Sequence, residues 1–481
     1  MGEVVGEKPH ALLVPFPLQG HINPMMQLAK KLVSDGFIVT FVNNESNHYL
    51  IMKAKKKMES TDANKEEIRM VSLPNNLPPE VPQDDVLKLL DLSNQTLACS
   101  LRKLIQDINE KEAHKVTCLI FDLAVFFIKE VAKHFDIPYA IFSPVSVATA
   151  ATCHMPSRLI SSGILSSNGT AQVNKTINAL PSMPPLHSTQ FAWMLGTEDE
   201  IQKTFQSTLA TEKQVREDII IFNSSYDLEA AVIKEYPEKG VALCPIGPLI
   251  PEQTGHHTRA GTLRTEDLKC LDWLHKQRPL SVLYVAFGSL ELILNEKQLQ
   301  ELALGLEATG RPFLWVLRSD FKAAMFPPGF VGRVGDRGCL VSWAPQLSVL
   351  SHPSIACFIT HCGWNSTVES ISIGVPLLCW PQSMDQFLNC SYIVNHWKIG
   401  LELVRNAWGI VEKEVLQKAV EKLLIEDDGI EMKKRVIMLK NSVRASVREE
   451  GSSCINYKRF LEAMKSNLEY SEIVRRLCED N

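Results

Sequence analysis

The sequence has little net charge and no long hydrophobic run. Its 481 residues include 50 Lys and Arg against 55 Asp and Glu, which gives a formal net charge of -5 at pH 7. This weakly acidic balance gives no electrostatic reason to expect a nucleic acid or an anionic membrane surface as a partner. The longest apolar runs, near 118–128 and 139–151, are interrupted by Asp122 or Ser143 and are too short to span a bilayer. We therefore expect no integral membrane association.

The amino-terminal residues lack a targeting signal, and the cysteines form no close pair. The first ten residues, MGEVVGEKPH, contain neither a basic segment nor an apolar one, so the sequence predicts no secretory signal. None of the 12 cysteines belongs to a CxxC pair, a pattern typical of reduced thiols in a protein core. We expect a cytoplasmic protein and take a monomer as the default state.

Several motifs of common enzyme classes are also absent. No GxGxxG follows the first predicted strand and no GxxxxGK[ST] occurs, which excludes the usual dinucleotide and nucleotide-hydrolase fingerprints. The metalloprotease motif HExxH and the hydrolase motif GxSxG are missing too. Because no Asp-x-Asp pair is present, an obvious anchor for a metal-bound diphosphate is lacking. We expect neither a metal nor a cofactor.

What is present predicts α/β domains. Hydrophobic residues make up 45% of the chain and charged residues 22%, as in ordinary globular proteins, and the length suggests two or three domains. In the first half, Ala11–Pro15 is predicted to be a buried strand that leads into a turn-rich loop. Pro24 occupies the place of a first helical residue, with Asn23 as its N-cap, and this helix is predicted to end near Ser34. The strand–loop–helix–strand order implies a parallel sheet with helices on its faces.

A polar segment without periodicity, residues 251–263, is the predicted linker between two domains. We therefore predict an amino-terminal domain over 1–250 and a carboxy-terminal domain over 264–481. The second domain opens with a strand over Ser281–Phe287 and a helix near 296–309, and the α/β alternation continues after it. Two doubly wound sheets that face each other place a cleft between the carboxyl ends of their strands.

The remaining elements are predicted with less regular spacing. Residues 155–215, rich in Ser, Thr, Pro and Met, are expected to form irregular helices and loops over one face of the first sheet. Strands are predicted at Val116–Phe121, Tyr139–Phe142, Phe313–Arg318, Cys339–Val341, Ile355–Thr360 and Val375–Cys379, and helices near 126–135, 412–425, 430–448 and 455–467.

The densest group of candidate site residues lies between Trp343 and Gln386. Within it, Ile355–Thr360 is predicted to be a strand, and His361-Cys362-Gly363-Trp364 is the turn at its carboxyl end. A helix is predicted to begin at Asn365. The free N–H groups and the dipole of such a helix start favour a phosphate.

Several side chains of this unit suit a nucleotide. His361, Asn365 and Ser366 can add hydrogen-bond donors near a phosphate. Glu369, one turn deeper, is placed to accept from sugar hydroxyls, and Trp343 offers a flat face on which a base can stack. Each residue alone is more often a core residue or a helix cap, but their convergence on one strand–loop–helix unit favours a ligand site.

The 44-residue stretch from Trp343 to Gln386 closely resembles the signature box of the plant family-1 UDP-glycosyltransferases. It matches in length, in its opening WAPQ, in HCGWNS, in Glu369 and in the closing DQ. The resemblance extends over essentially the whole chain and includes PFPLQGHINP near the start, VAFGS at 285–289 and EEGSSCIN near the end.

The resemblance implies a GT-B fold, in which two facing Rossmann-like domains hold the acceptor mainly in the first and the UDP-sugar in the second. A terminal Gln with that Trp commonly accompanies a glucose donor in this family, whereas galactose-using relatives often have His there. Matched by position, the resemblance places Trp343 on the uracil, Ala344 and Gln346 beside the base and ribose, and Glu369 at the ribose hydroxyls. It places His361, Asn365, Ser366 and Ser289 at the diphosphate, with Gly363 in the same turn. It places Trp364, Asp385 and Gln386 at the sugar.

His21 is a second candidate site residue. It lies in the loop after the first strand, on the cleft side, where an imidazole can accept a proton from an acceptor hydroxyl. Asp122 ends the strand Val116–Phe121 and can reach the same rim to orient the imidazole. From these residues alone, catalysis and simple capping of a loop and a helix are equally supported. The resemblance maps His21 and Asp122 onto the family's catalytic dyad.

Two residues depart from the family pattern. Ala356 stands where the box usually has Gly, within a strand, and we expect it only to adjust packing. Phe127 occupies a position where relatives often have Trp, and we expect it to shape the acceptor pocket. That pocket is expected to be lined by residues 80–100 and 140–200. Because these segments carry no fixed polar code, the sequence does not identify the acceptor.

The expected activity is transfer of glucose from UDP-glucose to a hydroxyl of a small lipophilic acceptor, a plant secondary metabolite or hormone, with inversion to a β-glucoside. Two alternatives remain open. One is a transferase of the same fold that uses another UDP-sugar or a nitrogen or sulfur acceptor. The other is a non-catalytic binder of UDP-sugar or small molecules.

Overall fold

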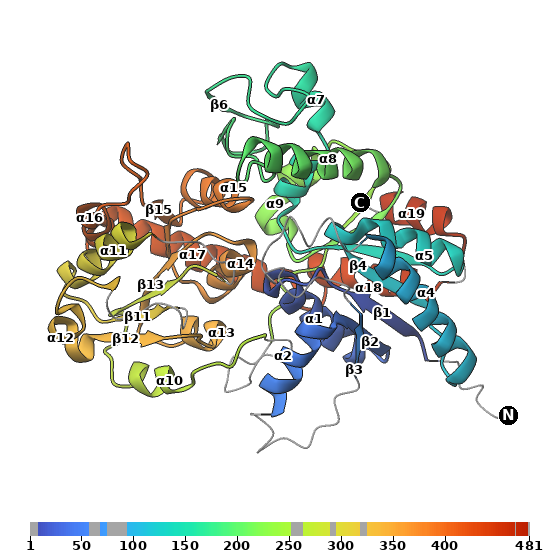
Figure 1. Cartoon of the computed structure of the whole chain (residues 1–481), viewed down its shortest axis with the longest axis horizontal. Coiled ribbons are helices and arrows are strands. Elements are labelled where there is room, and N and C mark those ends of the chain that lie inside the picture. Colours follow the sequence, from blue (N-terminus) through green and yellow to red (C-terminus); the bar gives the residue numbers. More distant parts are fainter. Residues whose placement is uncertain are drawn as a thin grey trace.

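The structure, a computed structural model, consists of two lobes that lie side by side (Figure 1). Each lobe is built on one parallel β-sheet with helices on both faces. The predicted doubly wound α/β architecture is therefore confirmed. The structure describes residues 8–56, 68–74, 94–251, 263–288, 295–317, 325–466 and 468–479.

The first lobe contains a seven-stranded sheet whose neighbouring strands all run parallel. Most of its strands are short and apolar, as expected for a sheet that is buried on both faces. They are β1 (His10–Val14), β2 (Ile38–Asn44), β3 (Ile68–Leu73), β4 (Cys118–Asp122), β5 (Tyr139–Ser143), β8 (Ile219–Phe222) and β9 (Ala242–Pro245). The order across the sheet is β3-β2-β1-β4-β5-β8-β9, which places β1 beside β4.

Helices cover both faces of this sheet. Helix α1 (Gln19–Ser34) packs on one face through its buried apolar residues. Helices α4 (Asn94–Lys111), α5 (Lys129–His134) and α6 (Val147–Cys153) pack on the other. The remaining elements of this lobe are α2 (Glu45–Lys56), η1 (Leu123–Ile128), α7 (Pro156–Ser161), β6 (Thr176–Ile177), β7 (Leu186–His187), α8 (Glu198–Gln214) and α9 (Tyr226–Lys234).

The second lobe contains a six-stranded parallel sheet. Its strands are β10 (Val282–Ala286), β11 (Phe313–Val316), β12 (Gly338–Val341), β13 (Ile355–Thr360), β14 (Leu377–Cys379) and β15 (Gly400–Glu402), in the order β12-β11-β10-β13-β14-β15. Helices α14 (Trp364–Ile373) and α17 (Asp427–Ser446) pack on one face, and α11 (Glu296–Ala308) and α16 (Lys413–Leu424) on the other. The shorter helices are α10 (Lys269–Leu274), α12 (Phe330–Val334), η3 (Gly335–Arg337), α13 (Gln346–Leu350), α15 (Gln386–Ser391) and η4 (Tyr392–His396).

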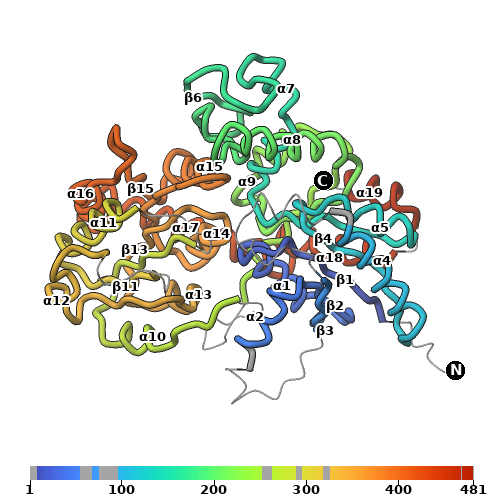
Figure 2. Tube along the Cα trace, viewed as in Figure 1, coloured from blue at the N-terminus to red at the C-terminus, as the bar shows by residue number. Residues whose placement is uncertain are grey.

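The end of the chain returns to the first lobe. Helices α18 (Ser452–Met464) and α19 (Tyr470–Glu479) join the same apolar cluster as α1, and the red end of the trace lies beside the blue sheet in Figures 1 and 2. The ring of Tyr470 stacks on that of Tyr139, with ring centroids 4.1 Å apart, and its hydroxyl accepts a hydrogen bond from the N–H of Ile219 at 3.2 Å. The last part of the predicted segment 264–481 therefore packs on the first sheet.

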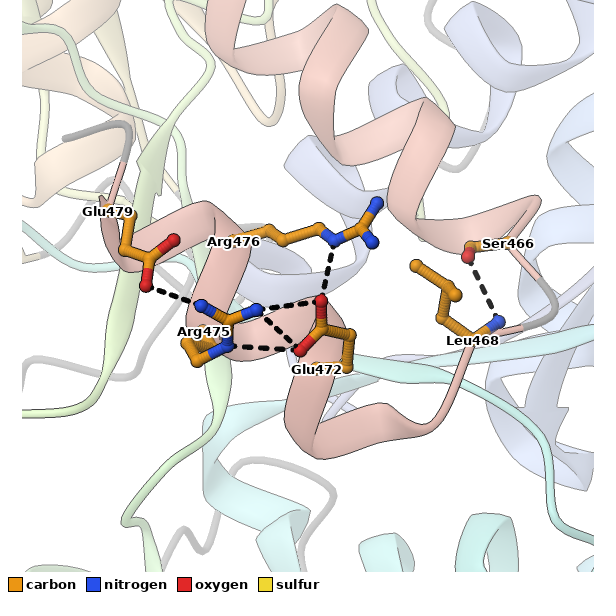
Figure 3. Close-up of polar contacts among 6 residues, drawn as sticks. All are labelled: Ser466, Leu468, Glu472, Arg475, Arg476 and Glu479. Carbon is orange, nitrogen blue, oxygen red and sulfur yellow. Dashed lines mark hydrogen bonds and ion pairs between the residues drawn. The ribbon is translucent and has the colours of Figure 1, made fainter.

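The solvent side of α19 carries an ion-pair network, which Figure 3 shows. The carboxylate of Glu472 accepts from Arg475 and Arg476, and Arg475 also bonds to Glu479. Both arginine side chains are more than half exposed, and ion pairs of this kind contribute little to stability. The helix is therefore held to the lobe mainly by its opposite, apolar side.

Helix α1 begins five residues earlier than the sequence predicted. The prediction that Pro24 is its first residue, with Asn23 as the N-cap, is wrong, because the helix starts at Gln19 and contains Pro24. Proline has no N–H to donate to the carbonyl of Gly20, four residues earlier, and it interrupts the helical hydrogen-bond pattern there. The interruption is tolerated because that carbonyl has another partner, described below.

Residues 155–215 contain one long regular helix, α8, where irregular structure was expected. This 17-residue helix begins with a capping box in which Thr197 and Glu200 bond to each other's backbone N–H. The Thr-x-x-Glu pattern was the sequence signal for this start. The rest of the segment is as irregular as predicted, with the short helix α7 and the two-residue strands β6 and β7.

The predicted boundaries at residues 250 and 264 stay predictions, because 252–262 lie outside the described residues. The same holds for the linker over 251–263. Among the residues that the structure describes, no helix combines the length and the apolar composition that a membrane span requires.

The apolar side of α19 yields a stability prediction. Ile473 is 3% exposed and packs in the core of the first lobe, so Ile473→Ala is expected to destabilise that lobe by about 2–4 kcal/mol. Arg475→Ala on the solvent side is the control and is expected to change stability by less than about 0.5 kcal/mol. Urea unfolding followed by circular dichroism measures both. Equal losses for the two variants would contradict this account of how α19 is held.

Candidate active site

A cavity opens where the carboxyl ends of the two sheets face each other. Doubly wound sheets bind ligands at this position. The first lobe lines it with Leu18, Gln19, Gly20, His21, Asn23, Pro144 and Val145, and the second lobe with Tyr284, Ala286, Gly288, Val316, Trp343, Ala344, Gln346, His361, Gly363, Trp364, Asn365, Ser366, Glu369, Met384, Asp385 and Gln386.

His21 and Asp122 form a hydrogen-bonded pair on the first-lobe side. Nδ1 of His21 lies 2.8 Å from Oδ2 of Asp122, whose side chain is fully buried, whereas the His21 side chain is 20% exposed and lines the cavity. Because an ionised carboxylate only accepts hydrogen bonds, Nδ1 carries the proton and Nε2 keeps its lone pair. The pair has the arrangement of a base and the group that orients it.

Asp122 also caps the helix that follows it. Its Oδ1 accepts from the N–H of Ala124 at 2.9 Å, at the start of η1. From the residues alone, helix capping and orientation of His21 were alternatives. In the structure Asp122 does both, because Oδ1 caps the helix and Oδ2 bonds to His21. The ring of Phe16 lies against the His21 ring with centroids 5.2 Å apart. These contacts hold the imidazole in one orientation.

The turn after β13 leads into α14, as predicted. Gly363 precedes the first helical residue, and Gly374 ends the helix in the left-handed conformation with a φ of 87°. The ten-residue helix opens into the cavity at Trp364, Asn365 and Ser366. The first N–H groups of a helix attract a phosphate, so the geometry here suits an anion.

His361 is a neutral side chain in this turn. Desolvation lowers its pKa to about 4, although a hydrogen bond with the backbone at Ala286 acts in the opposite direction. At neutral pH the imidazole therefore contributes hydrogen bonding rather than positive charge. Two glycines make room for it, because a Cβ at Gly288 or Gly363 would lie 2.6 or 2.4 Å from His361 Nε2.

Glu369 is held in place by hydrogen bonds within the second lobe. Nε2 of Gln346 donates to Oε2 of Glu369 at 2.8 Å and to Oγ of Ser366 at 3.0 Å. The hydroxyl of Tyr284 donates to Oε1 of Gln346 at 3.3 Å. The predicted ribose residues are thus one connected network. Tyr284 was not predicted, since a tyrosine in an apolar strand carries no local signal of a site.

Trp343 and Ala344 line the cavity beside this network. The guanidinium of Arg264 lies over the Trp343 indole, 5.4 Å from the ring centroid, and the N–H of Asp267 donates to the Trp343 carbonyl at 2.9 Å. Both contacts come from the segment that opens the second lobe, far away in the sequence. Residues distant in the sequence therefore hold the Trp343 indole in place.

Asp385 and Gln386 differ in what they offer to a ligand. Burial raises the pKa of Asp385 to about 6, while the hydrogen bond from Asn389 and the charge of a protonated His21 act in the opposite direction. Nδ2 of Asn389 donates to Oδ2 of Asp385 at 2.8 Å. The side-chain oxygen of Gln386 already accepts from the N–H of Gln382 at 2.8 Å. Asp385 is therefore the stronger acceptor for a sugar hydroxyl.

Trp364 joins the two lobes. It is only 3% exposed, and its indole N–H donates to the carbonyl of Asn223 in the first lobe at 3.0 Å. The ring lines the cavity, but its N–H is turned away from it. Any contact with a sugar is therefore made through the ring.

The box residues that the resemblance assigns to UDP-sugar binding all line this one cavity. Ser289 lies outside the described residues, as do residues 80–93 of the expected acceptor segment 80–100. Ala356 is buried within β13, as expected. Phe127 packs against the core of the first lobe and does not line this cavity.

Further lining residues, among them Gln19 and Met384, were missed in addition to Tyr284, whereas Pro144 and Val145 belong to the expected acceptor segment 140–200. Gln19 accepts from the N–H of Leu263, the last residue of the predicted linker, at 2.7 Å. Pro144, Val145 and Met384 supply apolar surface. Gln19 lies in the PFPLQGHINP stretch and Met384 in the box from Trp343 to Gln386, but only the meeting of the two lobes shows that they line the cavity.

The chain is similar to proteins of known sequence over nearly its whole length. A sequence profile of the family described as UDP-glucoronosyl and UDP-glucosyl transferase matches residues 12–445. UDP-glycosyltransferase 83A1 of Arabidopsis thaliana is 35% identical over 470 residues, with 96% of this chain and 98% of the relative covered. The 7-deoxyloganetin glucosyltransferase of Catharanthus roseus is 32% identical over 485 residues, with 96% and 97% covered.

A solved structure is similar over the same length. UGT2 of Phytolacca americana, complexed with UDP-2fluoro-glucose and pterostilbene, aligns with a TM-score of 0.77 at 29% identity. The alignment covers 94% of this chain and 98% of that chain. The GT-B fold expected from the sequence is confirmed.

The surroundings of Asp385 yield a titration prediction. Its carboxyl is expected to titrate near pH 6, because burial disfavours the charged form. Asn389→Ala removes a hydrogen bond to that form and is expected to raise the pKa further. Carboxyl 13C NMR of labelled aspartates, assigned with Asp385→Asn, measures both values. A pKa of about 4 in both proteins, the ordinary aspartate value, would contradict the described environment.

Proposed function

The chain belongs to the UDP-glucoronosyl and UDP-glucosyl transferase family, and we propose that it transfers glucose from UDP-glucose to a hydroxyl of a small apolar acceptor. The observation that carries the proposal is one shared cavity. It brings the His21–Asp122 pair of the first lobe to the start of α14 in the second. A base on one wall and an anion site on the other suit direct transfer between two bound molecules.

The charge of the cavity favours an uncharged sugar. In the part of the chain that the structure describes, no Lys or Arg side chain lines the cavity, and Asp385 lies where the sugar is proposed to bind. A uronate carboxylate would find no cationic partner there and would be repelled by the Asp385 carboxylate. Asp385 instead accepts from the hydroxyls of a neutral hexose. The closing Gln386 supports glucose over galactose through the family pattern.

The UDP part is proposed to bind to the second lobe alone. Trp343 stacks on the uracil with Ala344 beside it, and the Gln346–Glu369 network accepts from the ribose hydroxyls. The diphosphate binds at the start of α14, where the helix dipole and free N–H groups compensate its charge. His361 and Ser366 lie beside this start and Ser289 is proposed to join them, so the proposal includes no metal and no cofactor.

The acceptor is proposed to be small and largely apolar. Leu18, Pro144 and Val145 are the apolar lining residues on the first-lobe side, beside the polar Gln19 and Asn23, and Met384 adds apolar surface from the second lobe. His21 is the titratable group on this side. An acceptor is therefore held mainly by apolar contact and oriented by the bond between its hydroxyl and the imidazole.

The transfer is proposed to occur in one displacement. Nε2 of His21 takes the proton of the acceptor hydroxyl as its oxygen attacks the anomeric carbon. The bond from that carbon to the diphosphate breaks on the opposite face, and UDP leaves with the electron pair. Asp122 stabilises the imidazolium that forms. Donors at the start of α14 stabilise the charge that develops on the leaving diphosphate.

A donor panel tests this function. Purified protein is incubated separately with UDP-glucose, UDP-galactose and UDP-glucuronate and a mixed library of small hydroxylated acceptors, and products are detected by mass spectrometry. A product heavier by one hexose with UDP-glucose, and little or none with the others, supports the proposal. Preferred use of another donor would overturn the donor assignment. UDP-glucose binding without any product would favour a non-catalytic binder.

The division between the lobes predicts the effect of removing the base. His21→Ala is expected to lower kcat by about 10²- to 10⁴-fold, because the general base is lost. UDP affinity, measured by calorimetry, is expected to stay nearly unchanged, because His21 belongs to the opposite lobe. Loss of UDP binding in this variant would contradict the division of roles.

The crowding around His361 predicts the effect of a methyl group in the turn. Gly363→Ala places a Cβ 2.4 Å from His361 Nε2, so the turn must shift and UDP affinity is expected to fall by at least about tenfold. Gly332→Ala is the control, because a Cβ there meets nothing within 4 Å. Calorimetric titration with UDP compares the two variants. Equal affinities would show that the turn does not hold the diphosphate.

A further inference from the structure

Pro24 leaves one carbonyl of α1 without its helical partner, and the second lobe provides a replacement. In a regular helix the N–H of residue 24 donates to the carbonyl of Gly20, but proline has no N–H. Nδ2 of Asn365 donates to this carbonyl instead, at 2.6 Å. The bond joins the first turn of α14 to the first turn of α1.

The residues next to Gly20 and Asn365 bond to other segments of the chain. Next to Gly20, the side chain of Gln19 accepts from the N–H of Leu263 at 2.7 Å. Next to Asn365, the indole N–H of Trp364 donates to the first lobe at 3.0 Å. The Asn365–Gly20 bond therefore joins the turn that carries His21 directly to the turn that faces the diphosphate, while the neighbouring residues anchor each turn to another segment.

The amide of Asn365 can serve both turns at once. Since the carbonyl of Gly20 only accepts hydrogen bonds, the amide nitrogen must face it rather than the oxygen. That nitrogen carries two hydrogens, and the bond to Gly20 uses one of them. The second can donate to a diphosphate oxygen at the start of α14.

We propose that Asn365 is a positioning residue that couples donor binding to the placement of His21, through the Gly20 carbonyl that Pro24 leaves unpaired. The inference rests on the proposed function and adds a physical link between its two halves. Direct displacement requires the base and the anomeric carbon in close register, and a small misplacement lowers the rate strongly.

Hydrogen exchange without any nucleotide tests the link itself. Asn365→Ala is expected to speed amide exchange in residues 18–23 by about 2- to 10-fold, because the first turn of α1 loses its partner and opens more often. Gln27→Ala, two turns further along α1, is the control and is expected to leave this segment unchanged. If Asn365 only binds phosphate, its removal does not alter exchange in α1, and that result would overturn the proposal.

A double-mutant cycle tests the link during transfer. Pro24→Ala restores an N–H that draws the Gly20 carbonyl back along the helix axis, and kcat is expected to fall by about 2- to 10-fold with UDP affinity little changed. Pro24 does not line the cavity, so this effect must act through α1. The double variant Pro24→Ala, Asn365→Ala is expected to be no slower than Asn365→Ala alone.

The two experiments separate the inference from the proposed function. If the decreases in kcat caused by Pro24→Ala and Asn365→Ala multiply in the double variant, the coupling is overturned while the transferase function stays intact. A wild-type protein that transfers from no donor would overturn the function, and hydrogen exchange would still decide whether Asn365 holds α1. Circular dichroism confirms that each variant is folded before it is compared.

Discussion

The direction of the strands determines where the chemistry of this protein can occur. All strands of both large sheets are parallel to their neighbours, so the loops at the carboxyl ends gather along one edge of each sheet. These edges face each other across the cavity. His21 lies in the first turn of α1, which follows β1, Asp122 ends β4, and the turn proposed to hold the diphosphate follows β13. Neither edge alone holds both a base and an anion site.

Hydrogen-bond donors and a helix dipole, rather than cationic side chains, are proposed to compensate the charge of the diphosphate. No cationic Lys or Arg side chain lines the cavity within the described part of the chain, and desolvation keeps His361 neutral. The start of α14 is therefore the main positive element for a diphosphate. Asp385, with a pKa raised to about 6 by burial, adds an acceptor on the sugar side. Such a site suits a donor in which an uncharged sugar is bonded to an anionic diphosphate leaving group.

Local sequence predicted the parts of the site that lie within one strand–loop–helix unit. The box from Trp343 to Gln386 could be placed because its strand, turn and helix follow one another along the chain. Contacts between distant segments could not be predicted, as with Arg264 over Trp343. The predicted start of α1 was wrong for the same reason. Pro24 is tolerated inside the helix because Asn365 of the other lobe bonds to the Gly20 carbonyl, and this contact between distant segments has no local signal.

The return of α18 and α19 to the first lobe likewise has no local signal, because an amphipathic helix does not identify the sheet that it covers. The fold class and most strands were predictable, since apolar strands alternate regularly with helices. The acceptor could not be predicted, because the residues that line its side of the cavity carry no fixed polar code. Residues such as Val145 and Met384 gain a role only from their position beside His21.

The stereochemistry of the product tests the central claim most directly. A single displacement by one base forms the new bond on the face opposite the departing UDP, so an α-linked donor must give a β-glucoside. Proton NMR of the purified product distinguishes the two anomers through the coupling of the anomeric proton. A large, diaxial coupling is the predicted result. A small coupling, which shows retention and a two-step path, would contradict direct attack assisted by His21.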